Sequence, residues 1–449
     1  MIPASALLAL QSRDTIFQSI YRPPAAFTLT TLILSVLLAA IVAVVILYTI
    51  RHYVFTLNRL FGRQRHPYTD VQSAAWPAIT LVIPAHNEEL VIAHILDALL
   101  DVDYPREKLR VVPVNDRSTD RTQEILESYA AKYPALIFPV HRSEGKPGKA
   151  AALKEITETV TTDVMLVFDA DYIPGRGLIK QLVAPFFDPE VGAVMGRVVP
   201  LNSDTNLLTR LLDLERSGGY QVDQQARMNL HLVPQYGGTV GGVRTSALRE
   251  VGGWRDDTLT EDTDLTYRLL LSGWLTAYQN RSECYEEVPE TWPVRVRQIR
   301  RWAKGHNQAL GNYFGAVLRG RMFRGVLQRV DALMLLGVYA LSPLIAFGWI
   351  ISIALFYLGA TPFQGLIVIL VIASYSTLGN FAAFFEIAAA ARLDGSRGRS
   401  KLLPLVLFGF LISITSITAS AFSLKKLSPF RRALVWDKTH RYGKGRRES

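Results

Sequence analysis

Hydrophobic and polar positions divide the 449-residue chain into membrane segments and one soluble region. Residues 27–50 carry no charged side chain. At 1.5 Å per residue, a helix of that length crosses the roughly 30 Å hydrocarbon core of a bilayer. The stretch lies too deep in the chain for an ordinary signal peptide. The pattern predicts a retained transmembrane helix, with an N-terminal segment at 1–26 and a polar juxtamembrane linker at 51–76.

From residue 77 the pattern changes to short apolar runs that alternate with helical stretches, as in ITLVIPA, VIAHILDALL, LRVVPV and RTQEILESYA. Strand and helix in alternation predict an α/β domain with a mostly parallel sheet, which we place at 77–290. Residues 205–230 and 263–272 have helical spacing, and Gly273 closes the second helix. No G-x-G-x-x-G motif follows the first strand, so we expect a nucleotide-binding sheet without the Rossmann glycine fingerprint.

The C-terminal third is again apolar. A basic and aromatic stretch at 291–329 predicts helices on a membrane surface. The following membrane part, 330–424, holds three apolar segments, at 332–358, 363–385 and 402–424. Three full spans would put the tail outside, yet the tail at 425–449 is basic, which is typical of the cytoplasmic side. Lys401 and Lys425 flank the last segment, and this favours a re-entrant hairpin with a cytoplasmic tail.

Charge and cysteine content narrow the functional class and the cellular compartment of the protein. Lys plus Arg number 49 against 39 acids, a net charge of +10. The excess gathers beside the apolar segments, which indicates a cytoplasmic membrane face and argues against nucleic-acid binding. The single cysteine, Cys284, excludes an intramolecular disulfide and fits a reducing cytosol.

Two carboxylates mark a candidate metal site. The apolar run Val164–Phe168 leads directly into Asp169 and Asp171. Ligands collect beyond the carboxyl ends of strands in open α/β sheets, and paired carboxylates suit Mg²⁺ or Mn²⁺. The competing interpretation is a solvated acidic turn.

Three further motifs are ambiguous when taken singly. Asp116 follows a predicted strand. It is either a ligand for a nucleobase or ribose, or part of a loop that caps the next helix. Lys149 opens a helix behind a Gly-rich turn, which indicates an anion site or a surface turn. Asp262, after Glu261, is a general base or an acid that the helix dipole favours.

The basic stretch contains Gln298, Arg301 and Trp302. In a helix they share one face and offer an amide, a guanidinium group for pyrophosphate and a flat apolar surface. The alternative is an interfacial helix whose tryptophan lies among lipid headgroups.

In this order, the motifs resemble those of processive family 2 glycosyltransferases with the inverting GT-A fold, such as cellulose, chitin, hyaluronan and poly-N-acetylglucosamine synthases. The resemblance implies that Pro84, Asn87, Glu88 and Asp116 line the nucleoside pocket and that Lys149 approaches the phosphates. It implies that Asp169 and Asp171 form the metal-binding DxD, that Asp262 in the Thr-Glu-Asp motif is the base, and that Gln298, Arg301 and Trp302 form QxxRW.

The sequence departs from the family pattern at two places. Tyr236, Gly237, Gly238 and Thr239 stand where the family binds the acceptor sugar, but they lack its usual Phe- and Cys-containing form. Lys154 stands where many members carry Asn.

The resemblance implies a membrane-embedded inverting hexosyltransferase that uses Mg²⁺ or Mn²⁺. We expect a multi-pass protein of the cell membrane with a cytosolic catalytic domain, which moves a UDP-linked hexose or N-acetylhexosamine to a growing polysaccharide. The alternative is a single transfer to a lipid, giving a glycolipid. A nucleotide-sugar sensor without turnover is a third class, and the small membrane part is compatible with a partner subunit or a homo-oligomer.

Overall fold

The computed structural model describes residues 28–66, 75–358, 377–406, 417 and 443. Contacts divide the chain into two units: Met1–Arg51 with Leu341–Ala383, and His52–Ala340 with Phe384–Ser449. The expected N-terminal segment 1–26 lies outside the described residues, as do most of the expected segments 363–385 and 402–424 and nearly all of the tail 425–449.

The first unit contains most of helix α2 (Leu29–Phe61) and all of α13 (Leu341–Tyr357). Leu38, Ile41 and Val42 of α2 pack against Ile351 and Leu355 of α13. Within the described ranges, α2 is the one helix that by itself is long and apolar enough to cross a membrane. Counting α12 (Val326–Gly337) and α13 as one span would add a second candidate. The helix predicted at 27–50 continues to Phe61.

The second unit contains an eight-stranded sheet in the order β3-β2-β1-β4-β7-β6-β8-β5. The strands are β1 Ile79–Ala85, β2 Leu109–Asp116, β3 Val140–Arg142, β4 Val164–Val167, β5 Ile173–Pro174, β6 Val191–Pro200, β7 Gly241–Arg244 and β8 Leu275–Glu286. The α/β class is confirmed. Strands β3, β2, β1 and β4 run parallel, as do β6 and β8.

The sheet is mixed, with four parallel and three antiparallel pairings among the described strands, so most but not all of it is parallel, as expected. Strand β7 runs antiparallel to both β4 and β6, and β5 runs antiparallel to β8. Strand β7 has the sequence GGVR, which lacks the alternating or continuous apolar pattern by which a strand is found. It inserts between β4, which the sequence identifies as an apolar run, and β6.

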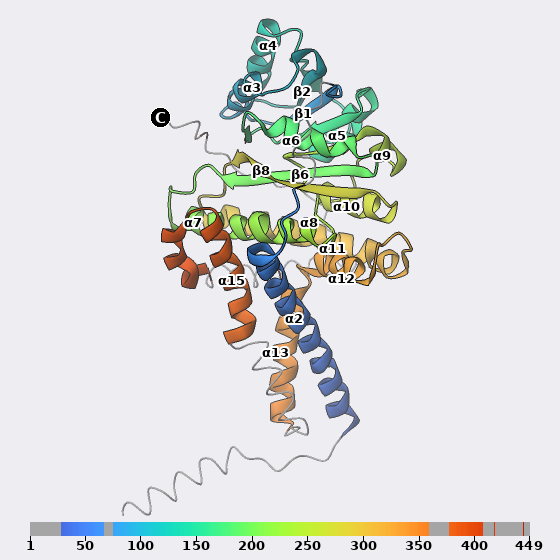
Figure 1. The fold of residues 1–449 in the computed structure, drawn as a ribbon, viewed down its shortest axis with the longest axis vertical. Coiled ribbons are helices and arrows are strands. Elements are labelled where there is room, and N and C mark those ends of the chain that lie inside the picture. Colours follow the sequence, from blue (N-terminus) through green and yellow to red (C-terminus); the bar gives the residue numbers. More distant parts are fainter. Residues whose placement is uncertain (1–27, 67–74, 359–376, 407–416, 418–442, 444–449) are drawn as a thin grey trace, which may run out of the picture. The chain divides into compact units, whose positions relative to one another are not determined.

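Helices cover the sheet and support the site. They are α3 Ile92–Leu100, α4 Thr122–Lys132, α5 Lys149–Thr159, α6 Leu178–Val183, α7 Leu207–Ser217, α8 Gln225–Asn229, α9 Thr245–Glu250, α10 Glu261–Leu271 and α11 Trp292–Arg319. Helix α15, Thr377–Leu393, belongs in part to each of the two units. The helix predicted at 205–230 is confirmed, with a π-helical segment η3, Gly218–Gln224, between α7 and α8. Figure 1 shows α7, α8 and α11 in a layer beside β6 and β8.

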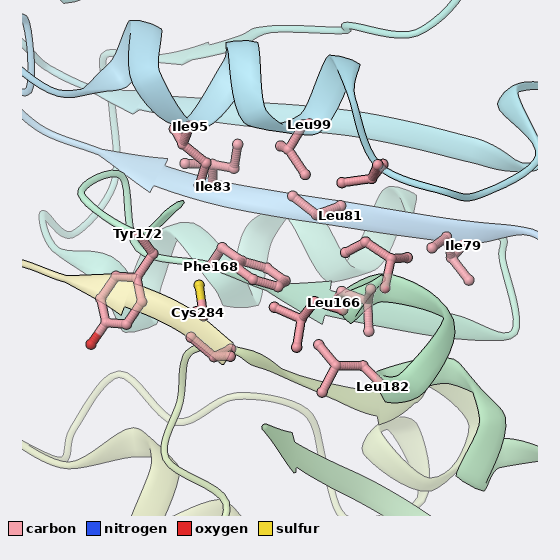
Figure 2. Packing of buried hydrophobic residues seen from close by; sticks show 14 of the residues in the cluster. Ile79, Leu81, Ile83, Ile95, Leu99, Leu166, Phe168, Tyr172, Leu182 and Cys284 are labelled. Atoms are coloured by element: carbon pink, nitrogen blue, oxygen red, sulfur yellow. The ribbon is translucent and has the colours of Figure 1, made fainter. Parts of the chain in front are cut away.

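The buried core holds the end of β4 rigidly. Figure 2 shows Ile83 and Leu81 of β1 facing Ile95 and Leu99 of α3, because alternate residues of a strand share one face. Phe168 is fully buried beside this layer. The residues that follow Phe168 therefore leave the core from a fixed point.

Candidate active site

Asp169 and Asp171 lie at the carboxyl end of β4, as the sequence predicts. The Asp169 N–H donates to Thr239 Oγ1 at 3.0 Å, and Lys149 Nζ lies 2.6 Å from Asp169 Oδ1. Asp171 is buried. In the described part of the chain, no three His, Cys, Asp or Glu side chains gather to hold a metal. The donor set still fits Mg²⁺ or Mn²⁺, which one or two carboxylates hold together with substrate phosphates and water. Asp169 also forms an ion pair with Lys149, so a bound metal ion would share this carboxylate with the ammonium group.

Lys149 joins Asp169 to Glu261 in the first turn of α10. Its Nζ lies 3.7 Å from Glu261 Oε1 as well as beside Asp169. Burial lowers the pKa of Lys149, but Asp169 and Glu261 outweigh it, so the pKa lies above its ordinary value and the side chain is charged. A fixed positive charge therefore stands between the two ends of the site.

Asp262 lies in the first turn of α10. Burial raises the pKa of Asp262, while a hydrogen bond from the Thr263 N–H at 2.7 Å and the charges of Lys149 and Arg301 oppose the rise. Burial also raises the pKa of Glu261. A carboxylate with a raised pKa in a buried position is suited to accept a proton near neutral pH.

A glycine turn packs against this carboxylate. Gly238 has φ +71°, and a Cβ added there would lie 2.9 Å from the Asp262 Cβ. Its neighbour Thr239 is buried and accepts the Asp169 N–H. The turn predicted for the acceptor therefore contacts both Asp262 and Asp169.

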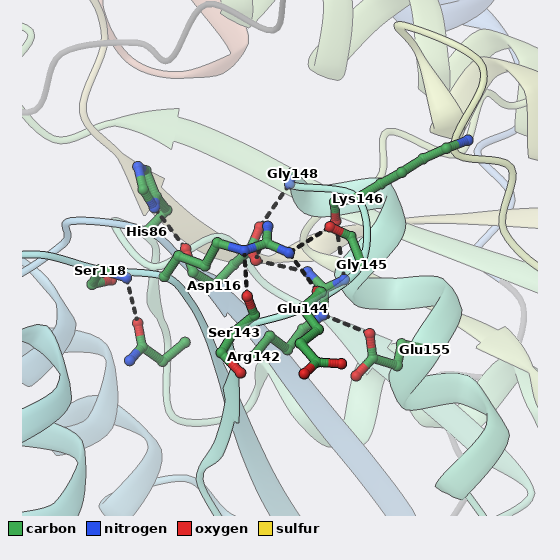
Figure 3. A network of polar contacts seen from close by, with 12 residues as sticks. His86, Asp116, Ser118, Arg142, Ser143, Glu144, Gly145, Lys146, Gly148 and Glu155 are labelled. Atoms are coloured by element: carbon green, nitrogen blue, oxygen red, sulfur yellow. Dashed lines mark hydrogen bonds and ion pairs between the residues drawn. The ribbon is translucent and has the colours of Figure 1, made fainter.

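Asp116 is held by an arginine and a backbone amide. Figure 3 shows this network. Arg142 Nη1 donates to Asp116 Oδ1 at 2.8 Å, and the Gly148 N–H donates to Oδ2 at 2.6 Å. Arg142 also donates to Glu155 Oε2 at 2.8 Å. The carboxylate thereby ties the end of β2 to the Gly-rich turn and the start of α5.

Hydrogen bonds connect the turn after β1 to the loop after β2. Asn87 has φ +53°; its Oδ1 accepts from the Thr119 N–H at 2.7 Å, and its N–H donates to Ser118 Oγ at 2.9 Å. The Glu88 N–H donates to Thr122 Oγ1 at 2.8 Å. Pro84 is half-buried and is the penultimate residue of the same strand. The capping alternative is also partly present, because Asp120 Oδ1 accepts the Thr122 N–H at 3.0 Å.

Helix α11 carries Gln298, Arg301 and Trp302. Arg301 bears electrostatically on Glu261 and Asp262, so it lies at the acidic cluster. Gln298 Oε1 accepts from Arg295 Nη1 at 2.8 Å.

The flat surface of Trp302 is already in contact with cations. The guanidinium groups of Arg216 and Arg295 lie over the indole ring, 5.3 and 5.4 Å from its centre. Such cation–π pairs stabilise a ring in place. The role of Trp302 under an acceptor sugar stays a prediction, and a sugar would share the ring with these side chains.

Three residues at the site were missed by sequence reasoning. Arg142 is buried against Asp116, and Glu286 joins Arg216 to Tyr172 with distances of 2.7 and 2.6 Å. These side chains come from elements far apart in the chain, so no local spacing indicates them. His306 is different, because it lies four residues after Trp302, at helical spacing, and that signal was available.

Comparison with known proteins identifies the relatives of this chain. Residues 77–305 match the family described as glycosyltransferase like family 2. The chain is 34% identical over 259 residues to the probable glycosyltransferase YdaM of Bacillus subtilis, covering 57% of this chain and 60% of the relative. It is 31% identical over 290 residues to the beta-monoglucosyldiacylglycerol synthase of Nostoc sp., covering 65% and 61%.

A third relative is the probable glucomannan 4-beta-mannosyltransferase 7 of Oryza sativa subsp. japonica, 35% identical over 240 residues, with 51% and 40% covered. The match thus spans less than two thirds of each relative's length.

Among solved structures, the mannosyltransferase PcManGT of Pyrobaculum calidifontis, in complex with GDP-Man and Mn²⁺, aligns with a TM-score of 0.55 and 22% identity. That alignment covers 81% of this chain and 98% of the neighbour, and it shows that the fold is shared. The family match covers residues 77–305, about half of the 449 residues, and includes the whole acidic cluster. The chain belongs to the glycosyltransferase-like family 2.

Proposed function

We propose that the protein transfers a sugar from a nucleotide sugar to an acceptor hydroxyl at the cytosolic face of the cell membrane, with inversion at the anomeric carbon. One observation carries the proposal: a single cluster joins Asp169, Lys149, Glu261 and the buried Asp262. It offers a cation-binding carboxylate, a fixed positive charge and a base in one place. The 33-residue apolar helix α2 supports the membrane location.

The donor lies along the carboxyl ends of β1, β2 and β4. The Asn87 turn and Asp116 flank the nucleoside, and Lys149 and Arg301 face the diphosphate. Positive groups that are already in place stabilise charge on a leaving group without reorganisation. A divalent cation held by Asp169 and Asp171 supplies further positive charge to the departing diphosphate when it is bound.

Asp262 acts on the acceptor. Its carboxylate takes the proton of the acceptor hydroxyl as that oxygen bonds to the anomeric carbon and the bond from carbon to diphosphate oxygen breaks. Attack from the face opposite the leaving group inverts the configuration. The Gly238–Thr239 turn lies against Asp262, and this supports its assignment to the acceptor side.

The first candidate acceptor is a growing polysaccharide, as in the processive synthases that the motifs resemble. The rice relative supports a polysaccharide acceptor, because it is named as a probable glucomannan mannosyltransferase. The second candidate is a glycerolipid, and two observations favour it. The Nostoc relative is named for a glycolipid product, and guanidinium groups lie over the Trp302 ring on which a sugar acceptor would stack.

A product assay tests the proposal and separates the acceptors. Full-length protein in lipid vesicles with and without diacylglycerol receives Mg²⁺ or Mn²⁺ and radiolabelled UDP- and GDP-sugars. Label in high polymer supports the synthase, and label extracted with lipid supports the glycolipid enzyme. Nucleotide-sugar binding without transfer to either fraction would contradict the proposal and point to a sensor. The Asp262→Asn variant, which lacks the proposed base, is the negative control for transfer.

A further inference from the structure

His306 is a buried histidine of α11 that belongs to none of the predicted motifs. Its side chain is 8% exposed, and its Nε2 lies 3.3 Å from Thr263 Oγ1. Burial lowers the pKa of His306 to about 4, so the ring is neutral at neutral pH. It therefore acts as a hydrogen-bonding group and supplies no charge.

A glycine brings His306 to this position. A Cβ added at Gly305 would lie 2.3 Å from Thr260 Cγ2 and 2.6 Å from Thr260 Oγ1. Contacts this short are forbidden, so only glycine lets α11 approach the start of α10 so closely. The next residue, His306, then reaches Thr263 in the first turn of α10.

Thr263 connects His306 to the base. Its N–H donates to Asp262 Oδ1 at 2.7 Å, and its Oγ1 lies 3.4 Å from the same oxygen. Gln235 Nε2 donates to Thr263 Oγ1 at 3.1 Å. A hydroxyl has one hydrogen to donate. When that hydrogen points to Asp262, the remaining neighbour, His306 Nε2, must be a donor.

The surroundings of His306 favour that tautomer. In the described part of the chain, the buried Nδ1 has no hydrogen-bond partner, and the ring packs on Tyr339 with centres 4.8 Å apart. A proton on Nδ1 would be a buried donor without an acceptor, which is costly, whereas a proton on Nε2 has Thr263 as its acceptor. The Nε2 hydrogen of His306 then points to Thr263, and the hydroxyl hydrogen of Thr263 points to Asp262.

We propose that His306, acting through Thr263, is a positioning residue that holds the Asp262 carboxylate ionised and oriented as the base. Its catalytic consequence rests on the proposed function, whereas the hydrogen-bond chain exists in the resting protein. Other elements also place titratable or charged groups near Asp262: Lys149 of α5, Glu261 of α10, Arg301 of α11, Tyr220 of η3, and Tyr236 and Tyr339 from loops. Substitution of His306 leaves all of these groups in the chain.

The test measures the protonation of Asp262 directly. Infrared titration of the full-length protein in lipid, with Asp262→Asn subtracted, reports the pKa of this carboxyl without any substrate. His306→Phe keeps a ring but removes the donor, and we expect it to raise the Asp262 pKa by about half a unit to one unit because the charged form loses support. His306→Gln, which can donate from its amide, should restore the wild-type value.

A matched control lies on the same helix. Gln308 contacts the loop before α10, through Leu259 and Asp257, but not Thr263, so Gln308→Ala should leave the Asp262 pKa unchanged. If His306→Phe does not fold, Thr263→Val keeps the side-chain shape, removes the hydroxyl and should give the same upward shift. An unchanged Asp262 pKa in either folded variant overturns the proposal.

Turnover provides the second readout, with UDP-glucose and GDP-mannose as donors and Mn²⁺ present. We expect His306→Phe to lower kcat about tenfold and to move the acid limb of the pH profile upward, with the donor KM unchanged. A merely structural role would instead lower the active fraction without moving that limb, and this result would contradict the proposal. If the wild type transfers from neither donor, the proposed function fails for these sugars. The infrared titration still tests whether the hydrogen bonds from His306 through Thr263 stabilise the charged form of Asp262.

Discussion

Replacing Gly305 with alanine perturbs the contact that sets α11 against α10. The new methyl carbon would lie 2.3, 2.6 and 2.9 Å from three side-chain atoms of Thr260. Relaxing the shortest contact to an ordinary separation requires a movement of about 1 Å, and overpacking of this kind costs about 1–3 kcal/mol. Because α11 carries Arg301 and His306, we also expect transfer to fall by about 10- to 100-fold, as misplacements of this size do.

A second substitution isolates the cause. Thr260→Ala removes the two atoms at 2.3 and 2.6 Å and leaves the one at 2.9 Å, so it should relieve most but not all of the cost. The Thr260 hydroxyl is buried and makes no hydrogen bond to other described residues through Oγ1, so its loss alone should cost little.

Thermal unfolding and initial transfer rates of the two single variants and the double variant form the assay. We expect a positive coupling of about 1 kcal/mol or more between the substitutions. Additive losses, or a Gly305→Ala protein with wild-type stability and rate, would refute the steric argument. Gly311→Ala on the same helix is the control, because nothing lies within 4 Å of a Cβ added there.

Three further predictions follow from the site. Asp262→Asn should abolish transfer while leaving nucleotide binding intact; because burial raises the Asp262 pKa, the wild-type rate should fall with acidity at a pH above the usual carboxylate range. The His306 pKa is lowered from 6.5 to about 4, so the unfolded chain binds the extra proton between these values, and stability should drop by about 3 kcal/mol as pH falls from 6.5 to 4. His306→Gln should flatten that slope in unfolding titrations, and an unflattened slope would assign the protons elsewhere. Arg142→Met should cost about 1–3 kcal/mol because the buried Asp116 carboxylate loses its 2.8 Å contact with Arg142 and keeps only the 3.1 Å contact with Arg117 among its arginine partners. The loss should shrink in an Asp116→Asn background, and an equal loss in both backgrounds would contradict the pairing.

The sequence is informative where chemistry and local pattern coincide. The buried strand before Asp169 and the helix after Thr260 were predictable from apolar runs and helix signals alone. The antiparallel strand β7 was not, because two of its four residues are glycines and its place depends on pairing with β4 and β6. Long-range pairing of this kind leaves no mark in local propensity.

Side-chain partners were the least predictable part of the site. The sequence suggested Asp116 as a ligand for the nucleoside, but not that Arg142, 26 residues later, would bind it. It suggested Trp302 as a flat surface, but not that two arginines would lie over the ring. The partners of Asp116 and Trp302 depend on how distant elements pack. The two residues themselves can be recognised from their sequence motifs.

The anchoring of Asp116 bears on how quickly and how strongly a nucleotide can be exchanged. One carboxylate fastens β2, β3 and the start of α5 together through Arg142 and the Gly148 amide. The Gly-rich turn before α5 therefore loses its backbone entropy when the protein folds. Little backbone entropy remains to be lost there when a ligand binds. We expect nucleotide association to be a simple encounter with a small unfavourable entropy and no slow closing step at this edge of the sheet. Such a rigid cradle suits an enzyme that must release a spent nucleoside diphosphate and accept the next donor at every turnover.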